Sequence, residues 1–85
     1  MAKQVRLTLA KAIAKSNLRR ADAGERPITM NSLAVQAGVA TTTITRLGRS
    51  ADDPKAASAL SLDLAGRIVT VLDCGIEDLL EVIEA

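Results

Sequence analysis

Side chains suited to catalysis or metal binding are scarce in this chain of 85 residues. It has no histidine, and no Lys, Arg or His stands beside its single cysteine, Cys74, to favour a reactive thiolate. The acidic residues are scattered, with no catalytic motif around them. We therefore expect no enzymatic activity, no metal site, no cofactor and no internal disulfide. Cys74 is interpreted as a small buried apolar residue rather than a reactive thiol.

Threonine and arginine residues within positions 41–49 have a spacing suited to one helix face. At i, i+1, i+4, i+5 and i+8 stand Thr41, Thr42, Thr45, Arg46 and Arg49. Ile44 and Leu47, at i and i+3, occupy the opposite face. An outward face of hydroxyl and guanidinium groups suits a polyanion. The alternative is an edge strand, because threonines are poor helix formers, but no second strand candidate is present to pair with it.

A second short helix is predicted just before this stretch, over residues 30–37. Its apolar stripe comprises Leu33, Ala34 and Ala37. Gly38 follows as a C′ candidate, because a left-handed backbone there costs glycine little. Two short helices joined by such a turn form a helix-turn-helix, which presents its second helix to the DNA major groove.

The ends of these two helices carry partial capping signals. Thr29 can cap the first helix, but the third helical position is Ser32 rather than Glu or Gln, so a full capping box is not expected. Ala40 or Thr41 caps the second helix. Ala34 is small where the two helices would cross closely.

Charge is divided between the two halves of the chain. Residues 1–50 hold nine basic and two acidic residues, a balance of +7, and residues 51–85 hold two basic and eight acidic residues, a balance of −6. The basic half attracts a polyanion and the acidic half is repelled by it, although solvated charges can also segregate by chance. Without aromatic residues there is no platform for an unpaired base, so double-stranded DNA is favoured over single strands.

The motif residues, Leu33-Ala34, Ala37-Gly38-Val39, Ile44 and Leu47, resemble the helix-turn-helix of lambda repressor/Cro-type (XRE-like) regulators. Residues 60–65 and 72–80 are similar to the fourth and fifth helices of that family, so the resemblance covers about residues 28–82. The chain departs from the pattern at Met30 (usually Gln), Ala40 (usually Ser) and Gly48 (often Glu or an aromatic residue). Segments 19–28 and 48–60 are also longer than usual.

The resemblance implies two sets of DNA contacts. Base edges are expected to meet Thr41, Thr42, Thr45 and Arg46. Phosphates are expected to meet Arg49, Ser50, Thr29, Asn31 and Arg26. Arg46 is suited to guanine or to a phosphate, and Arg26 can instead be solvated. Lys11 and Lys15 are interpreted as a solvated helix face rather than phosphate ligands.

The expected fold is all-α, a compact five-helix bundle in one domain spanning residues 1–85. Helices are predicted over about 3–18, 30–37, 41–47, 62–72 and 76–84. Val5, Leu9 and Ile13 are predicted core residues, and Ser61 is the predicted N-cap of the fourth helix. Residues 19–27 are expected to be a polar loop, and one or two further helical turns can follow Pro54.

The last helix has more apolar residues than one small core can cover. The surplus predicts a homodimer interface at Leu79, Val82 and Ile83, with core closure of a monomer as the alternative. A dimer would read two half-sites of an inverted repeat about 34 Å apart.

Together these features predict a sequence-specific transcriptional regulator that binds double-stranded DNA, of the phage or mobile-element repressor kind, acting by promoter occlusion. The alternatives are an antitoxin with a toxin partner, or a helical protein-interaction module without DNA binding. The lone cysteine and the lack of a signal-peptide h-region predict a cytoplasmic protein. The uncharged run from Pro27 to Thr45 is too polar for a membrane span.

Overall fold

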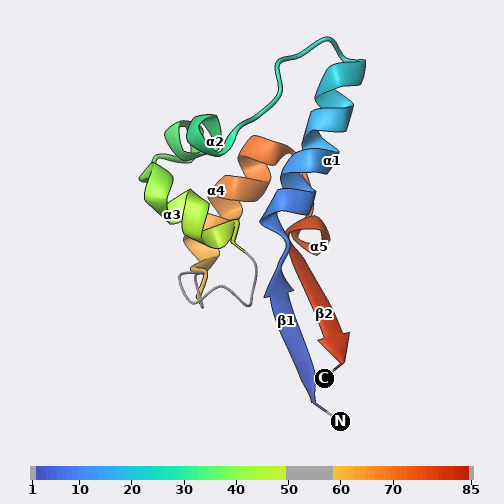
Figure 1. Ribbon diagram of the computed structural model, residues 1–85, viewed down its shortest axis with the longest axis vertical. Helices are drawn as coiled ribbons and strands as arrows, with labels where there is room; N and C mark the ends of the chain where they lie inside the picture. The colour runs from blue at the N-terminus through green and yellow to red at the C-terminus, as the bar shows by residue number, and fades with distance from the viewer. Residues whose placement is uncertain (1, 50–58, 85) are drawn as a thin grey trace.

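The computed structural model describes residues 2–49 and 59–84, which form a helical body with a two-stranded arm (Figure 1). In chain order the elements are β1 (Lys3–Leu7), α1 (Leu9–Asp22), α2 (Met30–Ala37), α3 (Thr41–Leu47), α4 (Leu62–Leu72), α5 (Ile76–Leu79) and β2 (Leu80–Glu84). The arm projects from the body and carries both chain termini at its tip. The molecule is accordingly elongated, with principal extents of 44 × 25 × 22 Å.

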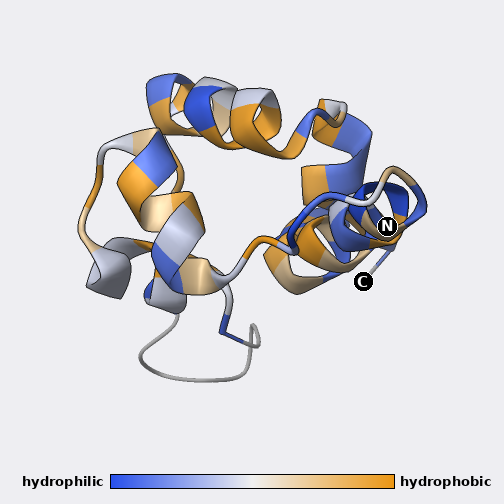
Figure 2. Cartoon of the chain, turned by 90° about the horizontal axis from the view of Figure 1, so that it is seen from above, coloured by the Kyte–Doolittle hydropathy of each residue, from blue (hydrophilic) through white to orange (hydrophobic). Residues whose placement is uncertain are grey.

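The core is aliphatic, as a chain without aromatic residues requires. Its largest fully buried side chains are Leu9, Leu33, Ile44, Ile68, Leu72 and Leu79. All five helices contribute to this set, and burial of each side chain contributes about 1.5–3 kcal/mol to folding. Figure 2 shows apolar and polar residues alternating along the helices, which gives each helix one side suited to the interior.

Both ends of the chain differ from the all-α expectation. Residues 3–7 and 80–84, predicted as parts of helices 3–18 and 76–84, are the two strands of an antiparallel sheet. Each strand pairs the backbone groups along one of its edges with the other strand, and the register sets Lys3 opposite Glu84 and Arg6 opposite Glu81. The fold is therefore mostly helical with a small sheet, and not all-α.

The predicted core of the first helix is correct except at its beginning. Leu9 and Ile13 are buried, but Val5 lies on the arm and is 66% exposed. A helix over residues 3–7 would have projected beyond the body with nothing to pack against, whereas pairing with β2 needs no core.

Helix α1 also extends further than predicted, through residues 19–22 of the expected loop. Arg19 donates from Nη2 to the Leu72 carbonyl at 2.9 Å and to the Asp73 carbonyl at 2.8 Å. Ser16 Oγ donates to the same Leu72 carbonyl at 3.0 Å. Because these carbonyls lie at the C-terminal end of α4, they supply a tertiary reason for α1 to continue.

Helices α2, α3 and α4 have the bounds that the sequence predicts. Ser61 caps α4 as expected, since its side chain accepts a hydrogen bond from the Leu64 amide at 3.1 Å. The extra helical turns after Pro54 and the phosphate ligand Ser50 lie outside the described residues. Within residues 2–49 and 59–84, no helix has the length and apolar character that crossing a membrane requires.

Candidate nucleic-acid interface

The start of α2 is fixed by a reciprocal pair of hydrogen bonds. Thr29 Oγ1 accepts from the Ser32 amide at 3.1 Å, and Ser32 Oγ accepts from the Thr29 amide at 2.9 Å. This is a full capping box, and the prediction that a full box is absent, made because Ser32 replaces the usual Glu or Gln, is wrong. A hydroxyl at the third helical position can reach back to the N-cap amide here.

Helix α2 is also positioned from α1 through Asn17. The Asn17 Oδ1 atom accepts from the Ile28 amide at 2.6 Å, and its Nδ2 atom donates to the Ile28 carbonyl at 3.0 Å. Ile28 itself is buried. The residue just before the N-cap is therefore held on both polar groups, although no local sequence signal identified Asn17.

The turn between α2 and α3 has the geometry predicted from Gly38. Gly38 adopts φ 74°, ψ 32°, and the Val39 amide donates to the Ala34 carbonyl at 3.0 Å. Arg67 on α4 donates from Nη1 to the Ala37 carbonyl at 3.2 Å and pairs through Nε with Asp63 at 3.1 Å. A cation at the C-terminal end of α2 stabilises that end.

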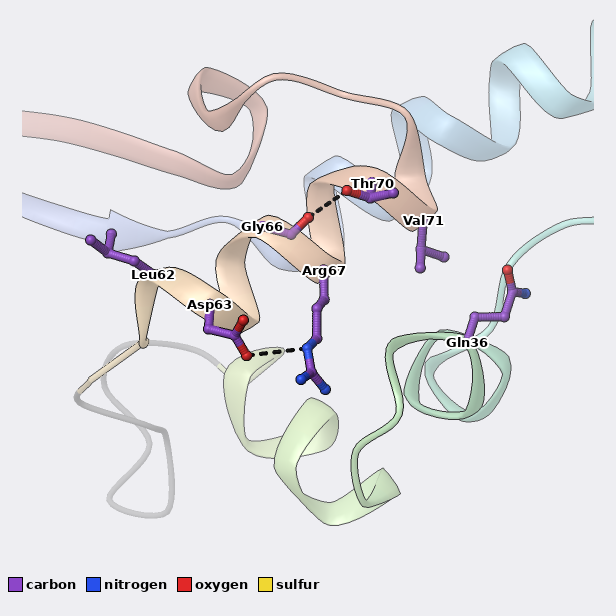
Figure 3. A pocket seen from close by; sticks show the side chains of 7 residues that line it. All are labelled: Gln36, Leu62, Asp63, Gly66, Arg67, Thr70 and Val71. Carbon is purple, nitrogen blue, oxygen red and sulfur yellow. Dashed lines mark hydrogen bonds and ion pairs between the residues drawn. The ribbon is translucent and has the colours of Figure 1, made fainter.

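Arg67 lies along an open groove beside α4, and Figure 3 shows it extending from that helix next to Asp63. The sequence predicts no role for Arg67. The one sequence feature that could have drawn attention to Arg67 is its charge, because it is one of two basic residues in the otherwise acidic segment 51–85. None of the predicted DNA-binding residues lines this groove.

Helix α3 presents opposite faces to the core and to solvent. Ile44 is 0% and Leu47 is 3% exposed. The polar face is exposed, and consists of Thr41, Thr42, Thr45 and Arg46. The stretch is helical, so the edge-strand alternative is wrong. Ala40 is the N-cap and makes no side-chain capping bond, which leaves the first turn of α3 without a side-chain acceptor at its amides.

Two hydroxyl protons on this face are used within the protein. Thr41 Oγ1 donates to Asn31 Oδ1 at 3.0 Å, and Thr45 Oγ1 donates to the Thr41 carbonyl at 3.0 Å. Thr41 and Thr45 therefore offer a ligand their methyl groups and oxygen lone pairs. Asn31 keeps its amide nitrogen as a donor, the kind of group that a phosphate oxygen accepts.

The other predicted phosphate ligands differ in how their side chains are used. Arg26 and Arg49 are exposed beyond the two ends of the helix pair. Thr29 is also exposed, but its hydroxyl group both accepts from the Ser32 amide and donates to Ser32 Oγ at 3.3 Å. Thr29 thus serves first as the cap of α2.

Two departures from the family pattern turn out to be neighbours. A Cβ atom on Gly48 would lie 2.5 Å from the terminal methyl of Met30, so Met30 occupies space that a larger residue at position 48 would need. Met30 is half-buried and packs against the core. A thioether cannot donate to phosphate, and at this position it instead packs the start of α2 against the end of α3.

The predicted dimer residues do not form one surface. Leu79 is fully buried in the protein's own core, so its assignment to an interface is wrong. Val82 and Ile83 are neighbours on β2 and therefore point to opposite faces of the arm. Val82 is 62% exposed and Ile83 is half-buried.

Cys74 is half-buried against the core rather than fully buried. Burial, followed by the charge of Asp78, raises the pKa of its thiol. A raised pKa disfavours the thiolate, which supports the interpretation of Cys74 as a packing residue.

The sequence from residue 23 to residue 85 matches the family model described as a Cro/C1-type HTH DNA-binding domain. This match includes α2, α3, α4, α5 and β2, and covers more than half of the chain. No curated protein and no solved structure matches the chain.

Proposed function

The chain belongs to the Cro/C1-type helix-turn-helix DNA-binding family and is a DNA-binding regulator, and from this premise we propose a sequence-specific repressor that acts by promoter occlusion. The observation that supports it best is the division of α3, whose apolar residues are buried while its threonines and Arg46 are exposed. Such a ridge of polar side chains fits the major groove of duplex DNA. Occlusion requires only tight binding at a promoter, and the repressor we propose is of the phage or mobile-element kind.

Base reading is assigned to the exposed face of α3. Arg46 can donate two hydrogen bonds to O6 and N7 of guanine. Thr42, near the N-terminal end of α3, would donate to a base acceptor. Thr41 and Thr45, whose hydroxyl protons are already used, are suited to contact a thymine methyl or to accept from a base amino group.

Phosphate contacts are assigned to residues around this face. Asn31 and Arg49 would flank the groove, with Arg26, Thr29 and Ser50 as further contacts. The Asn31–Thr41 hydrogen bond links a phosphate ligand directly to a base-reading residue. A movement of the Asn31 side chain on binding phosphate would therefore also move the side chain of Thr41.

The first experiment is selection of bound fragments from random duplex DNA, followed by affinity measurements on the recovered site at several salt concentrations. Log affinity should fall against log salt by roughly 0.9 for each phosphate contact. A recovered inverted repeat would indicate that two copies bind together. Absence of any duplex binding would contradict the proposal and favour a helical protein-interaction module, or an antitoxin whose partner is required for binding.

The sharper test is Arg46→Ala. It should weaken binding to the selected site by about 1–3 kcal/mol and relax the preference at one base pair, because a bidentate contact to guanine is lost. Fluorescence anisotropy on the selected site and on single-base variants measures both effects. Arg6→Ala is the matched control, since it removes the same charge from β1 and should change affinity by no more than about twofold. Equal losses in the two variants would show that Arg46 acts only through net charge.

A further inference from the structure

The turn that joins α2 to α3 is short, and its own residues do little to fix the first turn of α3. The connecting residues are Gly38, Val39 and Ala40. Gly38 has a left-handed φ of 74°, and glycine has a wider range of backbone conformations than other residues. Ala40 forms no side-chain capping bond, and Ile44, which is buried in the core, lies in the second half of α3. Contacts from neighbouring elements must therefore help to hold this turn.

Arg67 reaches the turn from α4. Its Nη1 atom donates to the Ala37 carbonyl at 3.2 Å, and a Cβ atom on Gly38 would lie 3.6 Å from the same nitrogen. Figure 3 shows the Arg67 side chain extending from α4 toward the α2–α3 pair. The Val39 amide donates further back along α2, to the Ala34 carbonyl at 3.0 Å. The guanidinium group therefore adds a bond at the last residue of α2, where the backbone turns toward α3.

Asp63, one helical turn earlier on α4, orients this guanidinium group. Arg67 Nε pairs with Asp63 Oδ2 at 3.1 Å, and the two side chains are 49% and 77% exposed. An ion pair so open to water contributes little free energy, but it restricts where the planar guanidinium group points. None of the residues assigned to bases or phosphates lines the groove that Arg67 lines. The described contacts of Arg67 are thus with the turn and with its own helix.

We propose that Arg67 is a positioning residue for DNA recognition, which holds the α2–α3 turn from α4 and so sets the orientation of Thr41 and Thr42 without contacting DNA. This inference rests on the proposed DNA-binding function. Without the bond to Ala37 the turn has more conformations in the free protein, and ordering them on binding lowers the affinity for a specific site. Non-specific binding depends on surface charge rather than on the orientation of α3, so it changes little.

The first test is Arg67→Met, which keeps an unbranched side chain but removes the hydrogen-bond donors. Affinity for the selected duplex should fall by about three- to tenfold, which corresponds to the net contribution of one hydrogen bond. Affinity for unrelated duplex DNA should fall by no more than about twofold. Fluorescence anisotropy measures both. Equal losses on the two duplexes, or no loss on either, would overturn the proposal.

Arg6→Met is the matched control for this variant. It removes the same charge from an exposed position on β1. Both affinities should fall equally, by no more than about twofold, because only a screened charge is lost. A preferential loss at the selected site in Arg6→Met, as large as that in Arg67→Met, would assign the effect to charge and overturn the proposal.

Salt dependence separates positioning from a direct phosphate contact. At the selected site, the slope of log affinity against log salt should be the same in Arg67→Met as in the wild type, because no phosphate contact is lost. A slope smaller by roughly 0.9 would show that Arg67 itself binds a phosphate, and this would overturn the proposal.

Hydrogen exchange of the free protein tests the hold on the turn without DNA. In Arg67→Met the Val39 amide, which bonds across the turn, should exchange about three- to tenfold faster, while the Ile13 amide in α1 should exchange as in the wild type. Unchanged exchange at Val39, or equal acceleration at both amides, would overturn the proposal, since the second result indicates only a less stable protein.

These measurements separate this proposal from the proposed function. If the wild type binds no duplex DNA, the proposed function fails, and hydrogen exchange still decides whether Arg67 holds the turn. If the wild type binds its selected site and Arg67→Met binds it equally well, the proposed function stands and the positioning role of Arg67 fails.

Discussion

The α2–α3 pair and the β1–β2 arm are both built from short elements, but they are held in place differently. In the pair, bonds such as Thr29–Ser32 and Asn31–Thr41 join residues close in sequence, and Ile44 anchors the outer helix in the core. In the arm, each pairing joins opposite ends of the chain, and Val5 remains exposed. The pair is fixed along its length, whereas the arm is fixed at its base.

This difference separates two kinds of surface. Helix α3 buries its apolar residues and exposes hydroxyl and guanidinium groups, which suits a hydrated, charged ligand such as DNA. The arm instead exposes the apolar pair Val5 and Val82, with the charged pair Lys3 and Glu84 next to it on the same face. Within the part of the chain that the structure describes, the two surfaces lie on separate elements, so they can be altered independently.

The largest expected effect on stability tests this difference directly. Ile44→Ala should lower the free energy of unfolding by about 2–5 kcal/mol, because it leaves a cavity at a fully buried position. Val82→Ala should cost less than about 1 kcal/mol in a dilute solution of monomer, because little surface is covered there. Urea unfolding followed by circular dichroism measures both. Similar losses would mean that the arm is packed along its length in the monomer.

The same difference explains which parts of the fold the sequence could predict. Thr29, Gly38 and Ser61 mark helix ends within a few residues of themselves, and α2, α3 and α4 follow these marks. At the two ends of the chain the apolar residues also have helical spacing, as Val5 with Leu9 and Leu79 with Ile83. This spacing led to helices being predicted over residues 3–7 and 80–84, which are strands. The partner of β1 lies at the other end of the chain, and one sequence contains no signal for that pairing.

Prediction of the candidate site was limited in the same way. The exposed face of α3 followed from residue spacing alone. Asn17 and Arg67 did not, because each reaches backbone groups on an element distant in sequence. The dimer assignment of Leu79 follows from the surplus of apolar residues in a helix predicted over residues 76–84, but α5 ends at Leu79 and this side chain is buried in the core.

A smaller effect on stability is expected when either of two glycines, Gly38 or Gly66, is replaced by alanine. Gly38→Ala should destabilise the protein by about 1 kcal/mol or more, since φ is +74° there. Gly66→Ala should stabilise it by up to about 1 kcal/mol, because Gly66 lies inside α4 and a Cβ atom there would meet nothing within 4 Å. Thermal unfolding measures the two shifts. If Gly66→Ala also lowers the melting temperature, the space beside Gly66 is not open in solution and a Cβ atom there meets a neighbouring group.

The smallest effect concerns the attachment of the arm to the body and depends on pH. Lys15 Nζ donates to Asp78 Oδ1 at 2.9 Å, and this hydrogen bond holds the pKa of Asp78 below its usual value of 3.8. A carboxyl whose pKa is lowered by folding contributes stability above its unfolded value, and this contribution is lost as the pH falls through the folded pKa.

The Asp78 carbonyl also accepts from Thr8, at the base of β1, so acid should loosen the arm before the helices of the body. The melting temperature should fall between neutral pH and acid by less in Asp78→Asn than in the wild type. Lys15→Met should reduce this fall by the same amount, because the hydrogen bond from Lys15 is the main cause of the lowered pKa of Asp78. Melting curves against pH for the wild type and the two variants give this comparison. Unchanged acid dependence in Asp78→Asn would place the pH-sensitive contact elsewhere, and hydrogen exchange at the amides of β1 would then show whether the arm opens first at all.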